Sequence, residues 1–130
     1  MKSALINAAM VGSGGFLGAL ARYGLSGLVH RFAPHATFPY GTLVVNLLGC
    51  LVIGVLAGLA ESRQLFGPEF RTFVLIGILG GFTTFSTFGY ETLSLMREGS
   101  HALAAANAVG QLLLGLAAVW AGIVVARGIV

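Results

Sequence analysis

One short stretch of the chain, residues 77–88 with the sequence GILGGFTTFSTF, interleaves hydroxyl and phenyl side chains. Its hydroxyl groups belong to Thr83, Thr84, Ser86 and Thr87, and hydroxyl groups can replace part of an ion's hydration shell. A phenyl edge carries the positive part of the ring quadrupole and can lean toward an anion. These residue types therefore fit the wall of a narrow ion path, although packing is the commoner role for a pair of phenylalanines.

Helical spacing distributes these side chains over three faces. Phe85 and Phe88 would share one face, one turn apart. The other two faces would carry hydroxyl groups, one with Thr84, Thr87 and Glu91 and the other with Thr83, Ser86 and Tyr90. Contact with lipid would not favour hydroxyl groups on two faces, whereas a pore would.

The same stretch lies inside an apolar run, residues 70–96, that can cross a bilayer core of roughly 30 Å at about 1.5 Å per residue. Three glycines, Gly77, Gly80 and Gly81, meet the hydroxyl residues near the expected midplane. Exposed main-chain amides or carbonyls at that depth need partners inside the protein or in a water-filled cavity. The pattern predicts a membrane-spanning helix that is broken near its middle and lines a polar path.

Composition indicates an integral membrane protein. Hydrophobic residues make up 57% of the 130 residues and charged residues only 8%, which is too much apolar surface for one soluble core. Seven Lys and Arg are too few and too scattered for a nucleic-acid surface. The single cysteine, Cys50, lies in an apolar run and is interpreted as a packed small residue.

Hydropathy divides the chain into one all-α domain of residues 1–130. Two glycine pairs, Gly14 with Gly18 and Gly54 with Gly58, have the small-xxx-small spacing on which membrane helices approach closely. Short polar loops separate four predicted transmembrane helices, at about residues 5–29, 41–60, 70–96 and 102–126.

Four polar side chains inside these spans need partners. Arg22 must pair, reach the interface or face a wet cavity, so it is either an anion-attracting group or a structural clasp. Asn46 has two amide donors for a neighbouring helix or for a passing anion. Asn107 and Gln111 lie one turn apart on the fourth span, and either helix contacts or a wet wall would explain them.

The chain contains no arrangement typical of an enzyme: no paired carboxylates, metal-ligand cluster or phosphate-binding loop. Two other membrane functions compete with a channel. A small proton-coupled transporter would need a deep titratable group, and Glu91 is the only carboxylate in a span, about eight residues beyond its middle. A structural accessory subunit would explain the glycine pairs but not the hydroxyl faces.

Positive charge specifies the orientation weakly. Lys2, Arg63, Arg71 and Arg127 would lie on one side of the membrane and Arg31 and Arg97 on the other. Four against two is a weak positive-inside signal, so the chain is expected to insert both ways. Four short spans give a thin wall, which predicts oligomers.

Three motifs in order resemble the small fluoride channels called Fluc or CrcB, over essentially the whole chain. They are GGFLGA at residues 14–19 with Arg22 and Tyr23, GTLVVNLLG at 41–49, and GGFTTFSTF at 80–88. The resemblance implies a fluoride-selective channel of the cell (inner) membrane that exports fluoride passively. It also implies an antiparallel, dual-topology homodimer with two pores and a central sodium ion.

The resemblance assigns roles to individual residues. The family's pore phenylalanines match Phe85 and Phe88, and its pore asparagine matches Asn46. Backbone carbonyls of about Gly80 and Thr83 would bind the sodium ion. The family's hydroxyl and charged positions match Thr42, Thr84, Ser86, Thr87, Glu91 and Arg22.

The fourth span departs from the family's pattern. Family members often carry a tyrosine and serines along a polar track there, whereas this chain has Asn107 and Gln111, followed by Gly115. Amide donors can replace hydroxyl groups, so both residues are included among the expected pore residues.

Overall fold

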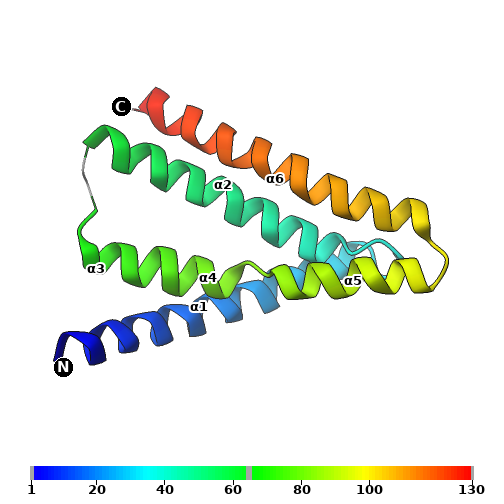
Figure 1. Cartoon of the computed structure of the whole chain (residues 1–130), viewed down its shortest axis with the longest axis horizontal. Helices are drawn as coiled ribbons and strands as arrows, with labels where there is room; N and C mark the ends of the chain where they lie inside the picture. Colours follow the sequence, from blue (N-terminus) through cyan, green and yellow to red (C-terminus); the bar gives the residue numbers. More distant parts are fainter. Residues whose placement is uncertain (1, 64–65, 130) are drawn as a thin grey trace.

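The protein is an all-helical bundle in the described part of the chain, residues 2–63 and 66–129 of a computed structural model. Its helices form four long rods, and Figure 1 shows how these rods are arranged. The first two are α1 (Lys2–Phe32) and α2 (Tyr40–Arg63), and the fourth is α6 (His101–Ile129). The third rod consists of α3 (Pro68–Phe70), η1 (Arg71–Leu79), α4 (Gly80–Phe82) and α5 (Phe85–Arg97).

Each rod is long and apolar enough to span a membrane, so the chain is a multi-pass membrane protein. The candidate spans are Ser3–Phe32, Tyr40–Glu61, Pro68–Arg97 and His101–Ile129. Every predicted span lies within one of them. The helices extend beyond the predicted bounds because their polar last turns continue the backbone hydrogen bonding that hydropathy does not register.

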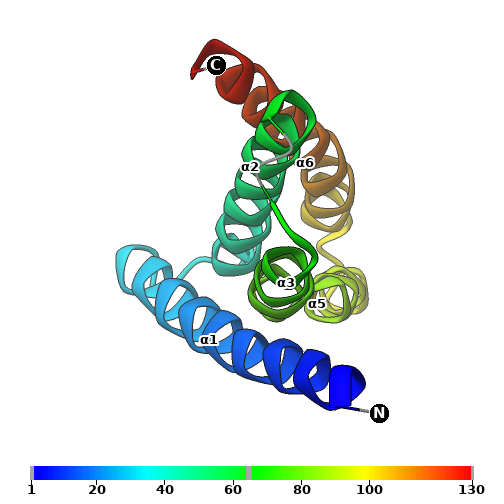
Figure 2. The ribbon, with the colours of Figure 1, turned by 90° about the vertical axis from the view of Figure 1, so that its left-hand side faces the viewer.

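The rods run up and down, so the described chain begins and ends at the same end of the bundle (Figure 1). α2 and α6 lie side by side along much of their length, and α1 packs along η1 and α4. The end view in Figure 2 shows the third rod between α1 and the α2–α6 pair, and its second half, α5, packs on α6.

Glycines set the closest helix contacts, as the sequence predicts. A Cβ on Gly14 would lie 2.9 Å from the Cα of Gly77, and one on Gly18 would overlap the carbonyl oxygen of Ile78. On the other side of the bundle, a Cβ on Gly54 would overlap the carbonyl oxygen of Val119. Both predicted glycine pairs therefore lie where main chains meet.

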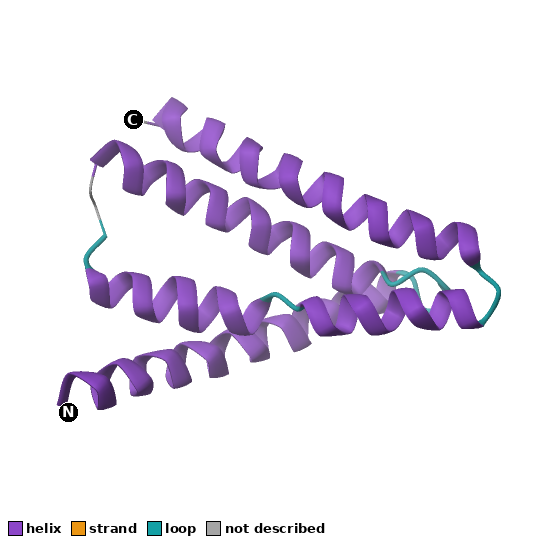
Figure 3. Ribbon diagram, viewed as in Figure 1, coloured by secondary structure: helices purple, strands orange, loops and turns teal. Residues whose placement is uncertain are grey.

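The third rod is broken near its middle, as predicted, and Figure 3 shows the loop between α4 and α5. The interruption is at Thr83 (φ −82°, ψ 158°) and Thr84 (φ −149°, ψ 119°), both extended. Gly80, in contrast, is helical at φ −62° and ψ −37°. The break therefore includes Thr83, within the stretch where the sequence predicts it, and extends to Thr84, while Gly80 stays helical. The helical faces assigned to Thr83 and Thr84 do not exist.

Packing explains why the glycines stay helical. A Cβ on Gly81 would lie 2.5 Å from the carbonyl oxygen of Gly15 on α1, so this glycine permits contact between two helices. Extended conformation suits the β-branched threonines that follow, and threonine is also a preferred residue for capping the next helix.

Candidate functional site

The break is held by one side chain from α2. The amide N–H of Thr84 donates to Oδ1 of Asn46 at 2.9 Å, and Nδ2 of Asn46 donates to the carbonyl oxygen of Thr84 at 3.1 Å. In a continuous helix the Thr84 amide would donate to the carbonyl of Gly80. Asn46 thus replaces the helical partners of an interrupted backbone at membrane depth, where unpaired groups are costly.

Thr84 then starts the second half of the rod. Its hydroxyl oxygen accepts from the amide of Thr87 at 3.3 Å, and it also hydrogen-bonds the Thr87 hydroxyl at 3.0 Å. The hydroxyl of Ser86 lies 3.5 Å from that of Thr84. Several hydroxyl groups therefore gather at the N-terminus of α5, where the first amides lack intrahelical acceptors and the helix dipole is positive.

The two phenylalanines lie next to the break. The rings of Phe85 and Phe88 have centroids 5.6 Å apart and are tilted by 52°. Together with Asn46, Thr84 and residues of α2, η1 and α6, they line a cavity of about 520 Å³, called here the phenyl cavity. Phe85 is 83% exposed as a whole residue, which leaves its ring edge available to an anion or to another chain.

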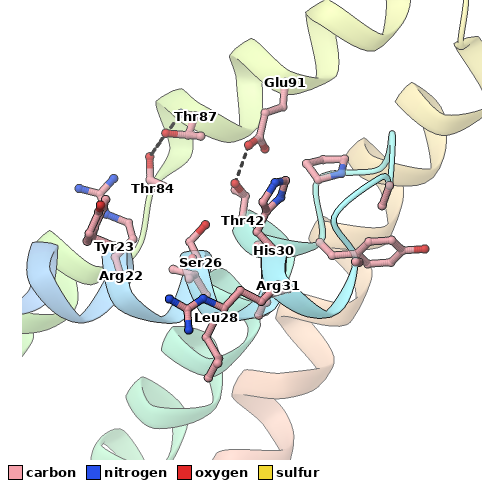
Figure 4. A pocket seen from close by; sticks show the side chains of 18 of the residues that line it. Arg22, Tyr23, Ser26, Leu28, His30, Arg31, Thr42, Thr84, Thr87 and Glu91 are labelled. Carbon is pink, nitrogen blue, oxygen red and sulfur yellow. Dashed lines mark hydrogen bonds between the residues drawn. The ribbon is translucent and has the colours of Figure 1, made fainter.

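A larger cavity of about 1040 Å³, called here the vestibule, lies between the last turns of α1, the first loop, α2 and α5 (Figure 4). Arg22, His30 and Arg31 of α1 line it. Among described residues Arg22 has no ion-pair partner. Thr84 lines both cavities, so the break lies between them.

One buried carboxylate lies in the vestibule wall. The Thr42 hydroxyl donates to Oε1 of Glu91 at 2.7 Å (Figure 4). Oε2 of Glu91 is buried and has no hydrogen-bond partner among the described residues. A buried carboxylate oxygen without a partner is destabilising, so we expect Oε2 of Glu91 to accept a hydrogen bond from water or from a donor outside the described residues.

A chain of hydrogen bonds links α6 to the break. Nδ2 of Asn46 donates to Oε1 of Gln111 at 2.8 Å, and Nε2 of Gln111 donates to Oδ1 of Asn107 at 3.0 Å. Nδ2 of Asn107 donates to Thr92 at 2.9 Å, and Thr92 donates to the carbonyl of Phe88 at 2.8 Å. This chain of four side chains, Asn46–Gln111–Asn107–Thr92, is called here the amide relay.

Comparison with known proteins identifies the family. The family described as CrcB-like protein, Camphor Resistance (CrcB), matches residues 9–123. The chain belongs to the CrcB-like family. A relative from Nitratidesulfovibrio vulgaris (strain Miyazaki F) is 52% identical over 88% of this chain and 91% of its own. One from Methylobacillus flagellatus is 49% identical over 87% and 88%, and one from Opitutus terrae is 50% identical over 89% of both. All three are named fluoride-specific ion channel FluC.

The structure gathers the residues matched to the CrcB-like family around the break. Five of the expected pore residues line the phenyl cavity, namely Asn46, Thr84, Phe85, Phe88 and Gln111. The vestibule is lined by Arg22, Thr42, Thr87 and Glu91, and again by Thr84. Ser86 is exposed beside Thr84, while the buried Asn107 lines neither cavity.

Sequence reasoning missed one residue of the site. Thr92 is neither in the hydroxyl-rich stretch nor on a cavity wall, yet it terminates the amide relay. The available signal was a hydroxyl residue one turn after Phe88 in the same helix. The alternatives for the two amides of α6 also separate: Asn107, fully buried, is a helix contact, and Gln111 reaches the cavity wall.

Proposed function

We propose that the protein is a fluoride-selective ion channel that lets fluoride leave the cell passively and so lowers its toxicity in the cytoplasm. The observation that carries the proposal is the juxtaposition, at one break in a membrane span, of amide, hydroxyl and phenyl-edge groups between two cavities. The names of the relatives, fluoride-specific ion channel FluC, supply the ion. The function is that of a channel and not of an enzyme.

The chemistry suits a small, strongly hydrated anion. Removing its water requires donors that are already in place, and each must bind weakly enough to release the ion. Basic groups of the vestibule, such as Arg22, would attract the anion. Hydroxyl groups at the start of α5 and the edges of Phe85 and Phe88 would then replace its water.

The alternative of proton-coupled transport has weaker support. Glu91, the only carboxylate that lies away from the ends of the described spans, lines the vestibule and accepts a hydrogen bond from Thr42, several residues away from the break. A carboxylate that couples protons to transport would be expected on the narrow path itself.

We propose further that two copies pair antiparallel within the membrane lipid. The weak charge asymmetry supports insertion in both orientations. Phe85, 83% exposed next to the phenyl cavity, supports a partner chain that would complete the wall on that side. Two copies would then provide two pores.

A structural sodium ion fits the proposed dimer. Thr83 is extended, and the Thr84 amide that would normally bond the Gly80 carbonyl is engaged by Asn46. Carbonyl oxygens released in this way are the hard neutral ligands that a small cation takes up. In the proposed dimer, carbonyls of Gly80 and Thr83 from both copies would hold the ion between the two breaks.

Reconstitution in liposomes tests the function. Purified protein is expected to release fluoride rapidly and passively, as recorded with a fluoride electrode. Slow flux that depends on a proton gradient would instead identify a transporter, and absence of flux would identify an accessory subunit.

A further inference from the structure

We infer that Gln111 is a positioning residue for conduction, which holds Asn46 on the break through the amide relay and so sets the geometry of the ion path. This inference rests on the proposed channel function. Gln111 lies in the fourth span, where family members often carry a tyrosine and serines along a polar track.

The oxygen and both N–H groups of the Asn46 side-chain amide are engaged, so its partners fix its orientation. Its oxygen accepts from the Thr84 amide, and its nitrogen donates both to the Thr84 carbonyl and to Oε1 of Gln111. An amide carries two N–H donors, so both are engaged. The third contact comes from α6 and holds the Asn46 side chain between the break and α6.

The far end of the relay fixes its direction. The carbonyl of Phe88 can only accept, so Thr92 must donate to it and its oxygen is left to accept from Asn107. Oδ1 of Asn107 is then left to accept from Gln111. Oε1 of Gln111 consequently faces Asn46 as an acceptor, which is the orientation that the Asn46 nitrogen needs.

Burial makes this arrangement costly to disturb. Asn107 is 0% exposed, and partly satisfied buried networks are worse than none, because each unpaired group keeps its full desolvation cost. Thr92 lines neither cavity and therefore lies off the proposed ion path. An effect of Thr92 on conduction would have to pass through the relay.

Two substitutions test the relay at its near and far parts. Gln111→Met keeps the length of the side chain but removes both the acceptor for Asn46 and the donor to Asn107. Thr92→Val keeps the shape but removes the hydroxyl group. Thr92→Ser restores the hydroxyl and should restore conduction. Thr72→Val is the matched control, because Thr72 also donates to a carbonyl four residues earlier, that of Pro68, but belongs to no relay.

The measurement is the unitary fluoride conductance of the full chain in planar bilayers, together with the fraction of active channels. We expect Gln111→Met to lower the unitary conductance about tenfold, the factor that corresponds to about 1.4 kcal/mol for the one of its two lost hydrogen bonds that orients Asn46. Thr92→Val should lower it in the same direction. The double variant should be no worse than Gln111→Met alone, because both substitutions interrupt one relay.

A purely structural role would reduce the number of active channels and leave the unitary conductance unchanged, and that result in Gln111→Met would overturn the inference. If Gln111→Met does not assemble, Thr92→Val decides in the same way. Unmodified protein is recorded in parallel. Its failure to conduct fluoride would overturn the proposed function, whereas normal conduction in both it and the variants would overturn only the relay.

Discussion

Thr42 of α2 donates its hydroxyl to Oε1 of Glu91 on α5 at 2.7 Å, and this bond joins two helices across the vestibule wall. The other carboxylate oxygen, Oε2, is buried without a hydrogen-bond partner among the described residues. The bond therefore supplies the single protein donor that this carboxylate has there. Loss of this hydrogen bond should therefore lower the stability of the folded protein.

The first prediction follows from that bond. Thr42→Val should lower the stability of the folded protein by about 1.5–3 kcal/mol, the range for hydrogen bonds to charged groups. In a Glu91→Gln background the same substitution should cost less, because the acceptor is then neutral. Denaturant titration of the four proteins in detergent measures the coupling. Equal costs in both backgrounds would show that the hydroxyl does not stabilise the carboxylate.

The second prediction concerns the ring pair. Phe85→Ile keeps apolar bulk and removes the polarised ring edge, so fluoride flux should fall severely while the oligomer still assembles. Phe88→Ile should act in the same direction. Phe32→Ile is a matched control, because Phe32 is also 83% exposed but lies at the end of α1 and lines neither cavity. Unchanged flux in Phe85→Ile would return that ring to a packing role.

The sequence predicts those features of the site that depend on residues close together in the chain. It does not predict those that depend on contacts between distant positions. The small-xxx-small spacing of Gly14 and Gly18 predicted a close helix contact because the signal is local, and the structure confirms the contact. The sequence predicts a break near the middle of the third span, but the residues at which it falls depend on a side chain distant in sequence. Asn46 captures the Thr84 amide across 38 positions, and glycine content alone does not reveal that.

The amide pair of α6 illustrates the same limit. Helical spacing placed Asn107 and Gln111 on one face, and their mutual hydrogen bond confirms that placement. Their partners, Thr92 for one and Asn46 for the other, come from two different helices. Only the tertiary packing of α6 against both α2 and α5 brings these groups together.

The third prediction tests the glycine contacts. Gly18→Ala should strongly destabilise the bundle, since the new Cβ would overlap the Ile78 carbonyl and neither main chain can move alone. Gly12→Ala, on the same helix, meets no atom within 4 Å and should be neutral or stabilising by up to about 1 kcal/mol through helix propensity. Thermal unfolding in detergent, followed by circular dichroism, compares the two. Equal stability of the two variants would contradict the close contact.

The fourth prediction concerns topology. Because the basic residues are divided only four against two, single copies should insert in both orientations and pair antiparallel. Tags at the N-terminus should then be accessible from both sides of sealed vesicles. Accessibility from one side alone would exclude dual topology for this protein. Adding lysines near one set of helix ends should fix the orientation and abolish the flux of the fixed form expressed alone.

The last prediction concerns sodium at the break. The proposed cage of carbonyls from Gly80 and Thr83 lies between the two breaks, apart from the fluoride path, so the bound ion should stabilise the dimer by mass action without carrying current. Each tenfold increase in sodium above its dissociation constant should add about 1.4 kcal/mol to dimer stability. Replacing sodium with a large organic cation, after long equilibration, should therefore weaken the dimer and then abolish fluoride flux.

A control for ionic strength is built into that exchange, because the total cation concentration stays constant and surface charge is screened equally. Thr83→Ser retains the main-chain carbonyl and should keep the dependence on sodium, since the proposed ligand is not the side chain. If dimer stability and flux were both indifferent to sodium removal, the carbonyls at the break would need another partner. Hydrogen-bond donors of the opposing copy would then be the remaining candidates for that partner.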